Sequence, residues 1–146
     1  GLDHNADVKT QNDEGHAPLH FAAQRGHLEA AKLLLDRGSD VNEKSGTDLR
    51  WSPLHSAICF SGRPELAKLL LEYGAEVDAK DSDGKTPLYC AARFENYVDL
   101  AMATLLLTMG ADVNAIDAEG VSPLDVARLY GHGAMIELLE SPIRNP

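Results

Sequence analysis

The stretch LLLEYGAEVDAKDSDGKTPLYCAA, residues 69–92, contains the two phrases that decide the fold. The first is a leucine triplet that leads to Gly74 and is followed by Ala75-Glu76-Val77-Asp78. The second is Thr86-Pro87-Leu88-Tyr89, in which a hydroxyl residue and a proline open an apolar run. A polar, glycine-bearing segment separates the two phrases, and both phrases occur elsewhere in the chain.

Both phrases return at a nearly constant distance. The prolines that precede a leucine are spaced by 35, 34 and 36 residues, and they are Pro18, Pro53, Pro87 and Pro123. The glycines that follow the leucine triplets are 36 residues apart, at Gly38, Gly74 and Gly110. Two independent phrases that share one period indicate that the chain is an array of repeats.

Each unit is predicted to form two short helices and a connecting turn. Proline suits the first turn of a helix, where its missing N–H costs nothing, and the hydroxyl residue before it is a natural N-cap in three units: Ser52, Thr86 and Ser122. Glycine readily adopts the left-handed conformation that ends a helix. The first helix should therefore end at Gly26, Gly62, Asn96 and Gly131. The polar residues before the next proline are predicted to form a turn or hairpin, which we call a finger.

These phrases closely resemble the ankyrin repeat, which has a Thr-Pro-Leu-His-like opening, paired alanines, a leucine triplet and a Gly-Ala-Asp-Val-Asn ending. The resemblance extends over residues 5–140. It implies an all-α repeat solenoid, an ankyrin repeat stack of antiparallel helix pairs joined by β-hairpin or turn fingers. We expect one domain over 1–146, with repeats at about 10–42, 43–78, 79–114 and 115–141 after the tail of a preceding repeat at 3–9. Because the chain starts inside a repeat, we expect it to come from a longer array.

The repeats depart from one length in a few places. The second finger has two extra residues within 43–51, and Arg50 stands where the other fingers have Gly15, Gly84 and Gly120. The first-helix regions of the second and third repeats are each one residue longer, and the third repeat gains two more residues around Tyr97 and Val98. Insertions in such arrays map to exposed loops, often on the binding face. Neutral drift is the alternative, and the sequence does not decide between them.

Composition and charge restrict the function. The 146 residues include 13 Lys and Arg against 23 Asp and Glu, which gives a net charge of −10. This acidic balance argues against nucleic-acid binding, which needs a basic footprint, and against an anionic membrane surface. The longest apolar stretch, residues 100–109, is too short to cross a bilayer. An acidic surface either keeps the protein soluble or attracts a basic partner.

The sequence contains no catalytic or metal-binding pattern. Cys59 and Cys90 lack metal-ligand spacing and are predicted to be reduced core residues of an intracellular protein, cytoplasmic or nuclear, with a disulfide as the alternative. Carboxylates such as those of Asp81 and Asp83 are predicted to cap turns, because the calcium-loop pattern is absent. No nucleophile is paired with a base. We therefore expect neither an enzyme nor a cofactor.

The histidines at repeat positions are predicted to be structural: His20, His27, His55 and His132. The resemblance implies that the histidine of the opening phrase bonds the preceding hydroxyl and nearby backbone. Ala17 lacks that hydroxyl, and Tyr89 and Asp125 replace the histidine. We expect this hydrogen-bond network to be weaker or rebuilt in the first, third and fourth repeats.

The fingers and the ends of the first helices are the expected contact surface. The finger segments contain thirteen acidic and five basic residues, so they carry −8 of the net charge of −10. Aromatic residues and arginine, which often dominate binding interfaces, occupy the position seven after each proline: Arg25, Phe60, Phe94 and Tyr130. Trp51 adds an indole in the longer finger. We expect these side chains to form an apolar strip inside an acidic rim, or alternatively to fill gaps between helices.

The sequence therefore predicts a non-catalytic protein–protein interaction module, an adaptor, scaffold or inhibitor, that is monomeric alone. Its partner would be a protein or peptide with basic and apolar features, bound on the concave finger and first-helix surface. The alternative is a targeting or substrate-recruitment domain of a larger enzyme, channel or bacterial effector. The resemblance also implies that Asn42 or Asn114 can be hydroxylated. The predicted contact residues are Asp13, Glu14, His16, Arg25, Asp48, Leu49, Trp51, Phe60, Asp83, Lys85, Arg93, Phe94, Glu119, Val121 and Tyr130.

Overall fold

The computed structural model describes residues 11–93 and 97–141. The predicted tail at 3–9, Phe94, Asn96 and the residues after 141 lie outside the described part. The helices are α2 (Pro18–Arg25), α3 (Leu28–Asp36), α4 (Pro53–Ser56), the π-helix η1 (Ala57–Ser61), α5 (Pro64–Glu72), α6 (Pro87–Ala92), α7 (Tyr97–Thr108), α8 (Pro123–Leu129) and α9 (Gly133–Glu140).

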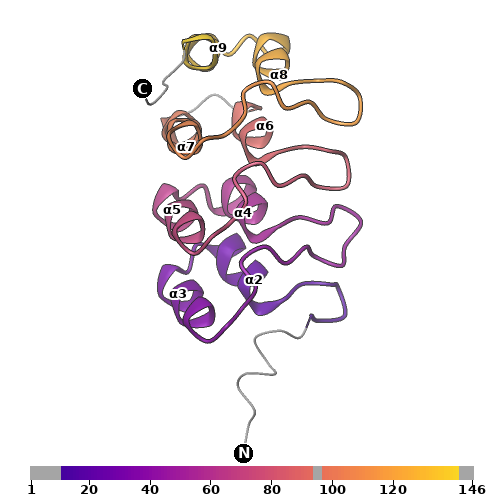
Figure 1. Ribbon diagram of the computed structural model, residues 1–146, viewed down its shortest axis with the longest axis vertical. Coiled ribbons are helices and arrows are strands. Elements are labelled where there is room, and N and C mark those ends of the chain that lie inside the picture. The colour runs from indigo at the N-terminus through magenta and orange to yellow at the C-terminus, as the bar shows by residue number, and fades with distance from the viewer. Residues whose placement is uncertain (1–10, 94–96, 142–146) are drawn as a thin grey trace, which may run out of the picture.

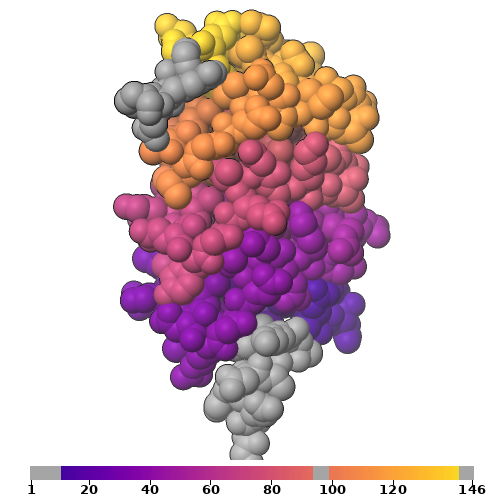
Figure 2. Space-filling view, viewed as in Figure 1, coloured from indigo at the N-terminus to yellow at the C-terminus, as the bar shows by residue number. Residues whose placement is uncertain are grey.

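The helices stand in two columns. Figure 1 shows α2, α4, α6 and α8 above one another in one column and α3, α5, α7 and α9 in the other, with the fingers projecting beyond the first column. Consecutive helices form antiparallel pairs, and successive pairs follow one another as bands along the molecule (Figure 2). This is the all-α stack that the sequence predicts. The boundaries of individual repeats remain a prediction.

The core lies between the columns and between neighbouring pairs. Its fully buried side chains come from each pair of the stack and include Leu19, Leu54, Leu70, Leu88, Leu106 and Met135. Ala23, Ala57, Ala91 and Ala127 have no exposed surface, and their small side chains let the first helices approach their neighbours closely. One pair alone would leave much of this apolar surface in water. Stacking therefore supplies the hydrophobic stabilisation of the fold.

The predicted N-caps form, and three of the four first helices end where predicted; α6 ends at Ala92, four residues before the predicted end at Asn96. The hydroxyls of Ser52, Thr86 and Ser122 each accept the N–H three residues on, at 3.3, 3.2 and 3.1 Å. Ala17 has no side chain that can do so, and the Nδ1 of His20 instead accepts the Ala17 N–H at 2.9 Å. Gly26, Gly62 and Gly131 end their helices in the left-handed conformation.

One insertion lies in a helix rather than in an exposed loop. The Gly62 N–H donates to the Ala57 carbonyl at 2.8 Å, across five residues, which is the hydrogen bond of a π turn. A π turn takes up one more residue than an α turn. The extra residue of the second repeat is thereby absorbed within η1, and the expectation that such insertions map to loops is wrong at this position.

The fingers are turns, and no strand occurs in residues 11–93 and 97–141. A carboxylate or amide oxygen caps each regular turn: Asp81 Oδ1 accepts the N–H groups of Asp83 and Lys85, both at 2.9 Å, and Asn12 and Asp117 do the same in their own fingers. The predicted turn-capping role of Asp81 is confirmed. In the longer second finger Arg50 has a positive φ of 51°, as the glycines at its equivalent positions have.

Buried histidines connect the first and second helix pairs to the finger that follows each of them. The Nε2 of His20 lies 2.8 Å from the Glu43 carbonyl, and the Nε2 of His55 lies 2.9 Å from the Lys85 carbonyl. Each Nδ1 is bonded within its own opening phrase, so each ring is neutral with its proton on Nε2. In the fourth pair Asp125 Oδ2 accepts the Ser122 N–H at 3.0 Å instead. The network is rebuilt there, as the sequence predicts.

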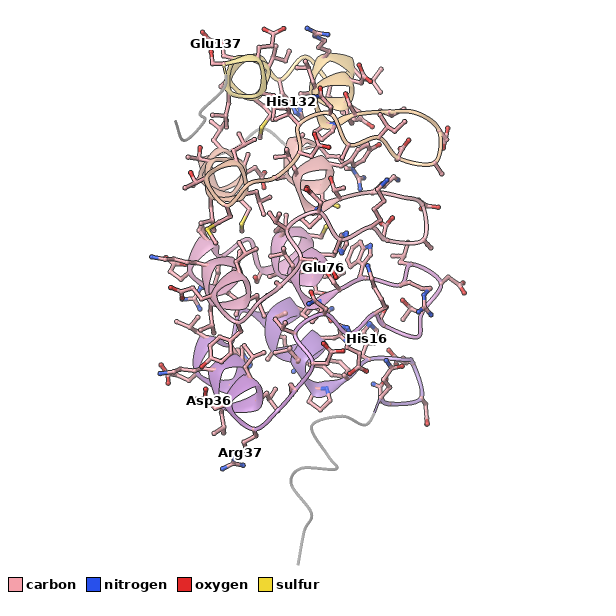
Figure 3. The ribbon with its side chains drawn as sticks, viewed as in Figure 1. His16, Asp36, Arg37, Glu76, His132 and Glu137 are labelled. Atoms are coloured by element: carbon pink, nitrogen blue, oxygen red, sulfur yellow. The ribbon has the colours of Figure 1, made fainter. Side chains whose placement is uncertain are left out.

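The other predicted structural histidines differ from each other. The Nδ1 of His132, in the α8–α9 loop, lies 3.2 Å from the Ala92 carbonyl of α6, so it connects two helix pairs. Figure 3 shows His132 between these elements. His27 is exposed, and its side chain does not cap α3.

Neighbouring fingers are also joined directly. The N–H groups of Gly46, Ser82 and Ala118 donate to carbonyls of the preceding finger at 2.7, 2.8 and 2.9 Å; the acceptors are Gly15, Leu49 and Asp83. These bonds require close backbone approach. A Cβ added to Gly84 would lie 2.8 Å from the Ala118 nitrogen, whereas a Cβ on Gly120 would meet nothing within 4 Å.

Gly84→Ala and Gly120→Ala form a matched pair that measures this approach. Both glycines have positive φ, 78° and 81°, so alanine costs about 1 kcal/mol of strain at either position. At Gly84 the overlap with the next finger adds about 1–3 kcal/mol. Urea unfolding should show Gly84→Ala to be clearly less stable than Gly120→Ala. Equal losses would mean that the fingers do not need this contact.

His55 should make stability depend on pH. Burial lowers the pKa of His55 from 6.5 to about 4. The unfolded chain therefore binds a proton at His55 below about pH 6.5, while the folded chain resists it until about pH 4. The free energy of unfolding should fall by roughly 3 kcal/mol from this group as the pH drops from 7 to 4.

The measurement is urea unfolding at a series of pH values for the parent chain and His55→Gln. The variant should be less stable at pH 7 and should show a shallower loss toward pH 4. His27→Gln, at the exposed position, is the control and should keep the parent's slope. If the free energy of unfolding changed with pH in the same way for the parent and His55→Gln, the lowered pKa of His55 would be contradicted.

Candidate protein-binding surface

The predicted contact residues lie mostly on the outside of the fingers and at the ends of the first helices. Nine of those that the structure describes are exposed and belong to this side: Asp13, Glu14, Arg25, Asp48, Leu49, Phe60, Asp83, Glu119 and Tyr130. Arg93, just after α6, is exposed as well. His16, Trp51, Lys85 and Val121 are half-buried. Figure 3 shows His16 on the finger side and Asp36, Arg37 and Glu137 on the second-helix column.

Trp51 and Phe60 form an aromatic pair in the middle of the stack. Their ring centroids are 5.4 Å apart, with the rings tilted by 59°. Trp51 stacks on His55 at 6.3 Å, and its Nε1–H donates to Asp81 Oδ2 at 3.1 Å. The ring of Trp51 is therefore held in place, while Phe60 is 58% exposed. A fixed, partly desolvated aromatic pair of this kind is a typical anchor for an apolar side chain.

The other members of the predicted strip are farther along the stack. Tyr130 is 57% exposed and stacks on His132 at 5.8 Å. The guanidinium of Arg25 lies 5.7 Å from the centroid of the Phe21 ring, in a cation–π arrangement. Phe94, the third-repeat member of the predicted strip, is outside the described residues. The structure therefore brings Trp51 and Phe60 together, and a continuous strip remains a prediction.

The acidic and basic residues of the fingers have different environments. The carboxylates of Asp13, Glu14, Asp48, Asp83 and Glu119 are exposed, and none forms an ion pair within residues 11–93 and 97–141. In contrast, Lys44 Nζ donates to the Lys80 carbonyl at 2.5 Å, and Lys80 Nζ lies 3.4 Å from the Ile116 carbonyl. Burial lowers the pKa of Lys44. The lysines therefore bridge fingers, and the acids at the tips face solvent.

Lys85 is also engaged within the protein. Its ammonium lies 5.4 Å from the centroid of the Tyr89 ring, and its carbonyl accepts the hydrogen bond of His55. Burial raises the pKa of the Tyr89 hydroxyl. Lys85 therefore contributes to the internal packing of the third repeat, beside its predicted role as a contact.

His16 has an incomplete hydrogen-bond set. Its ring is packed against His20 and Phe21, with centroids 6.0 and 5.4 Å away, and its buried Nδ1 has no partner among the described residues. The sequence singled out His16 but missed Phe21, which lies three residues after Pro18 and supports both His16 and Arg25. It also missed Leu129, 75% exposed beside Tyr130.

Asn42 connects two repeats. Its Nδ2 donates to the Gly74 carbonyl at 3.1 Å, and its Oδ1 accepts the Glu76 N–H at 2.8 Å. Asp78 holds the corresponding place one repeat later, where its Oδ1 accepts the Asp112 N–H at 3.0 Å. Asn114 is exposed. Hydroxylation of either asparagine remains a prediction.

Metal-binding clusters and membrane-spanning helices are absent from the described residues. No three His, Cys, Asp or Glu side chains among them gather to hold a metal ion. None of the described helices is both long and apolar enough to cross a membrane.

Comparisons with known proteins agree with this architecture. A family model for ankyrin repeats (3 copies) matches residues 2–81 and 62–144. The E3 ubiquitin-protein ligase Ufd4 of Drosophila melanogaster is 46% identical over 82 residues, 56% of this chain and 3% of that protein. The human Neurogenic locus notch homolog protein 2 is 37% identical over 89 residues, 60% of this chain and 4% of that protein.

The NF-kappa-B inhibitor cactus of Drosophila melanogaster is 38% identical over 53 residues, 36% of this chain and 10% of that protein. The matched region is thus a tenth or less of each of these relatives. The family model covers nearly the whole chain, and the repeated helix pairs and fingers are those that its name describes. The chain therefore belongs to the ankyrin repeat family, whose repeats are protein-interaction modules.

Proposed function

We propose that this chain binds a basic, partly apolar segment of another protein on its finger and first-helix side. The observation that carries the proposal is the separation of roles among the finger residues. The exposed acids at the tips are not paired with bases of the described chain. In contrast, Lys44 and Lys80 each hydrogen-bond to a carbonyl of the following finger. The outward charge of this side is therefore negative and available to a partner.

The aromatic pair supplies the apolar part of the proposed site. Phe60 offers more than half of its surface to a ligand, and Trp51 supports it from the neighbouring finger. Asp48 and Asp83 are exposed on the finger of Trp51 and on the next finger. A matching segment would place an apolar or cationic side chain on the aromatic pair. It would carry Lys or Arg nearby, to meet the carboxylates. The surrounding charge would speed the encounter with such a segment.

The broader properties follow from the family and from this surface. Ankyrin repeats are generally non-catalytic, and relatives that are enzymes, such as the ubiquitin-protein ligase, carry additional sequence beyond the matched region. We further propose that the chain is monomeric when alone and intracellular, in the cytoplasm or nucleus. The two free cysteines support the intracellular location.

A second candidate function is recruitment of a substrate or target for a larger protein. It is favoured by one observation: the matches to the relatives cover 3 to 10% of their length. In that case the same surface would select what the rest of the protein acts on. The full-length reading frame would distinguish an independent adaptor from a recruitment domain.

Two charge reversals and the removal of one aromatic side chain test the proposed surface. Asp48→Lys with Asp83→Lys should reduce capture of the partner from a cell lysate by at least about tenfold, because attraction becomes repulsion. Phe60→Ala should produce a similar loss by removing the anchor. Binding to the parent chain should weaken as salt rises from low to high concentration. Quantitative mass spectrometry of captured proteins would measure each ratio.

Matched controls lie on the second helices. Glu29→Lys with Glu65→Lys changes the net charge equally at exposed positions of α3 and α5, and Met109→Ala removes an exposed apolar side chain after α7. These variants should retain the partner. If the control variants lose the partner while the finger variants keep it, binding occurs on the second-helix column and the proposed surface is wrong.

A further inference from the structure

Two thiols from neighbouring helix pairs meet inside the stack. Cys59 lies in η1 and Cys90 in α6, and these two elements pack against each other. Both cysteines are free, and the two thiols hydrogen-bond each other. Cys90 is 2% exposed, whereas Cys59 is half-buried. The corresponding positions in the other repeats are not cysteines, so this thiol pair occurs once in the chain.

The environments of the two thiols differ. The hydrogen bond from Cys90 lowers the pKa of Cys59, the positive charge of Arg93 acts in the same direction, and burial opposes both. The bond to Cys59 raises the pKa of Cys90, and burial raises it further. Cys59 is thus the thiol that ionises first, and the thiolate is the nucleophilic form. Exposure and ionisation both select Cys59 as the attacking residue.

We propose that Cys59 and Cys90 are an oxidation-sensitive dithiol that a hydroperoxide closes to a disulfide between the second and third helix pairs. This modification site is independent of the proposed binding function. It differs from a structural disulfide of a secreted protein, because the reduced pair already packs within the folded stack.

The reaction balances in two steps. The Cys59 thiolate attacks one oxygen of the peroxide; the S–O bond forms, the O–O bond breaks, and the hydroxide that leaves is protonated to water. Cys59 is then a sulfenic acid. The Cys90 sulfur attacks the Cys59 sulfur; the S–S bond forms, the S–O bond breaks, and the departing hydroxide takes the Cys90 proton as water. Two thiols are oxidised, and one peroxide is reduced to two waters when hydrogen peroxide is used.

The π turn gives the bond a local consequence. Cys59 is followed directly by Phe60 within η1. A bond from Cys59 to α6 would fix η1 at the residue next to the exposed ring. It would also link residues that are 31 positions apart, which restricts the unfolded chain. The oxidised protein should therefore melt several degrees higher than the reduced one.

The experiment treats the folded 146-residue chain with hydrogen peroxide, blocks remaining thiols, and maps peptides without reductant by mass spectrometry. A Cys59–Cys90 linked peptide in monomeric protein is expected, and reductant should remove it together with the rise in melting temperature. After the same treatment in urea with dimedone present, a larger share of the oxidised Cys59 should be labelled and a smaller share linked to Cys90, because the unfolded thiols are no longer held together when the sulfenic acid forms.

Two variants separate the steps. In Cys90→Ser, Cys59 should stop at the sulfenic acid, which dimedone labels; in Cys59→Ser, Cys90 should stay reduced. If either variant fails to fold, the peptide map of the parent chain and the comparison with urea decide by themselves. The proposal is overturned if the folded parent retains dimedone-reactive Cys59, forms only dimers linked through Cys59, or resists peroxide.

Discussion

The structure depends on polar bonds that connect successive helix pairs and fingers. The hydrophobic effect drives the stacking of pairs, but an apolar face alone does not fix how far one pair slides over another. The buried rings of His20 and His55 fix it, because each has a single carbonyl partner one repeat on. Tyr89 replaces the histidine in the third repeat. There the alignment with the next repeat is held by bonds between fingers, such as that from the Ala118 N–H to the Asp83 carbonyl.

This constraint also bears on the surface proposed for binding, which lies on the fingers. Their internal groups are occupied: Asp81 caps its own turn and holds the indole of Trp51, and Lys44 bonds the following finger. What remains exposed on this side is a row of tip carboxylates, the ring of Phe60 and a smaller number of basic side chains, among them Arg50 and Lys80. The bonds that order the backbone thus leave an excess of negative charge facing solvent on the proposed surface.

The periodic features of the fold could be predicted from the sequence, and the single-copy features could not. Proline, hydroxyl and glycine positions located the helices because each acts through local backbone geometry. The π turn at Ala57–Ser61 was visible only as one surplus residue, which a loop would have explained equally well. For the site, the sequence chose exposed residues correctly at Phe60 and Tyr130, but the orientation of Trp51 depends on Asp81, 30 residues away.

The arrangement of the pairs has a mechanical consequence. Packing contacts run between neighbouring pairs, and α2 and α8 lie at opposite ends of the first-helix column (Figure 1). Tension applied between those ends passes through every pair in series rather than being shared among parallel strands. The weakest junction should yield first and leave the others folded, so that the molecule extends in steps. Under such a load, a stack of this kind would lengthen one junction at a time.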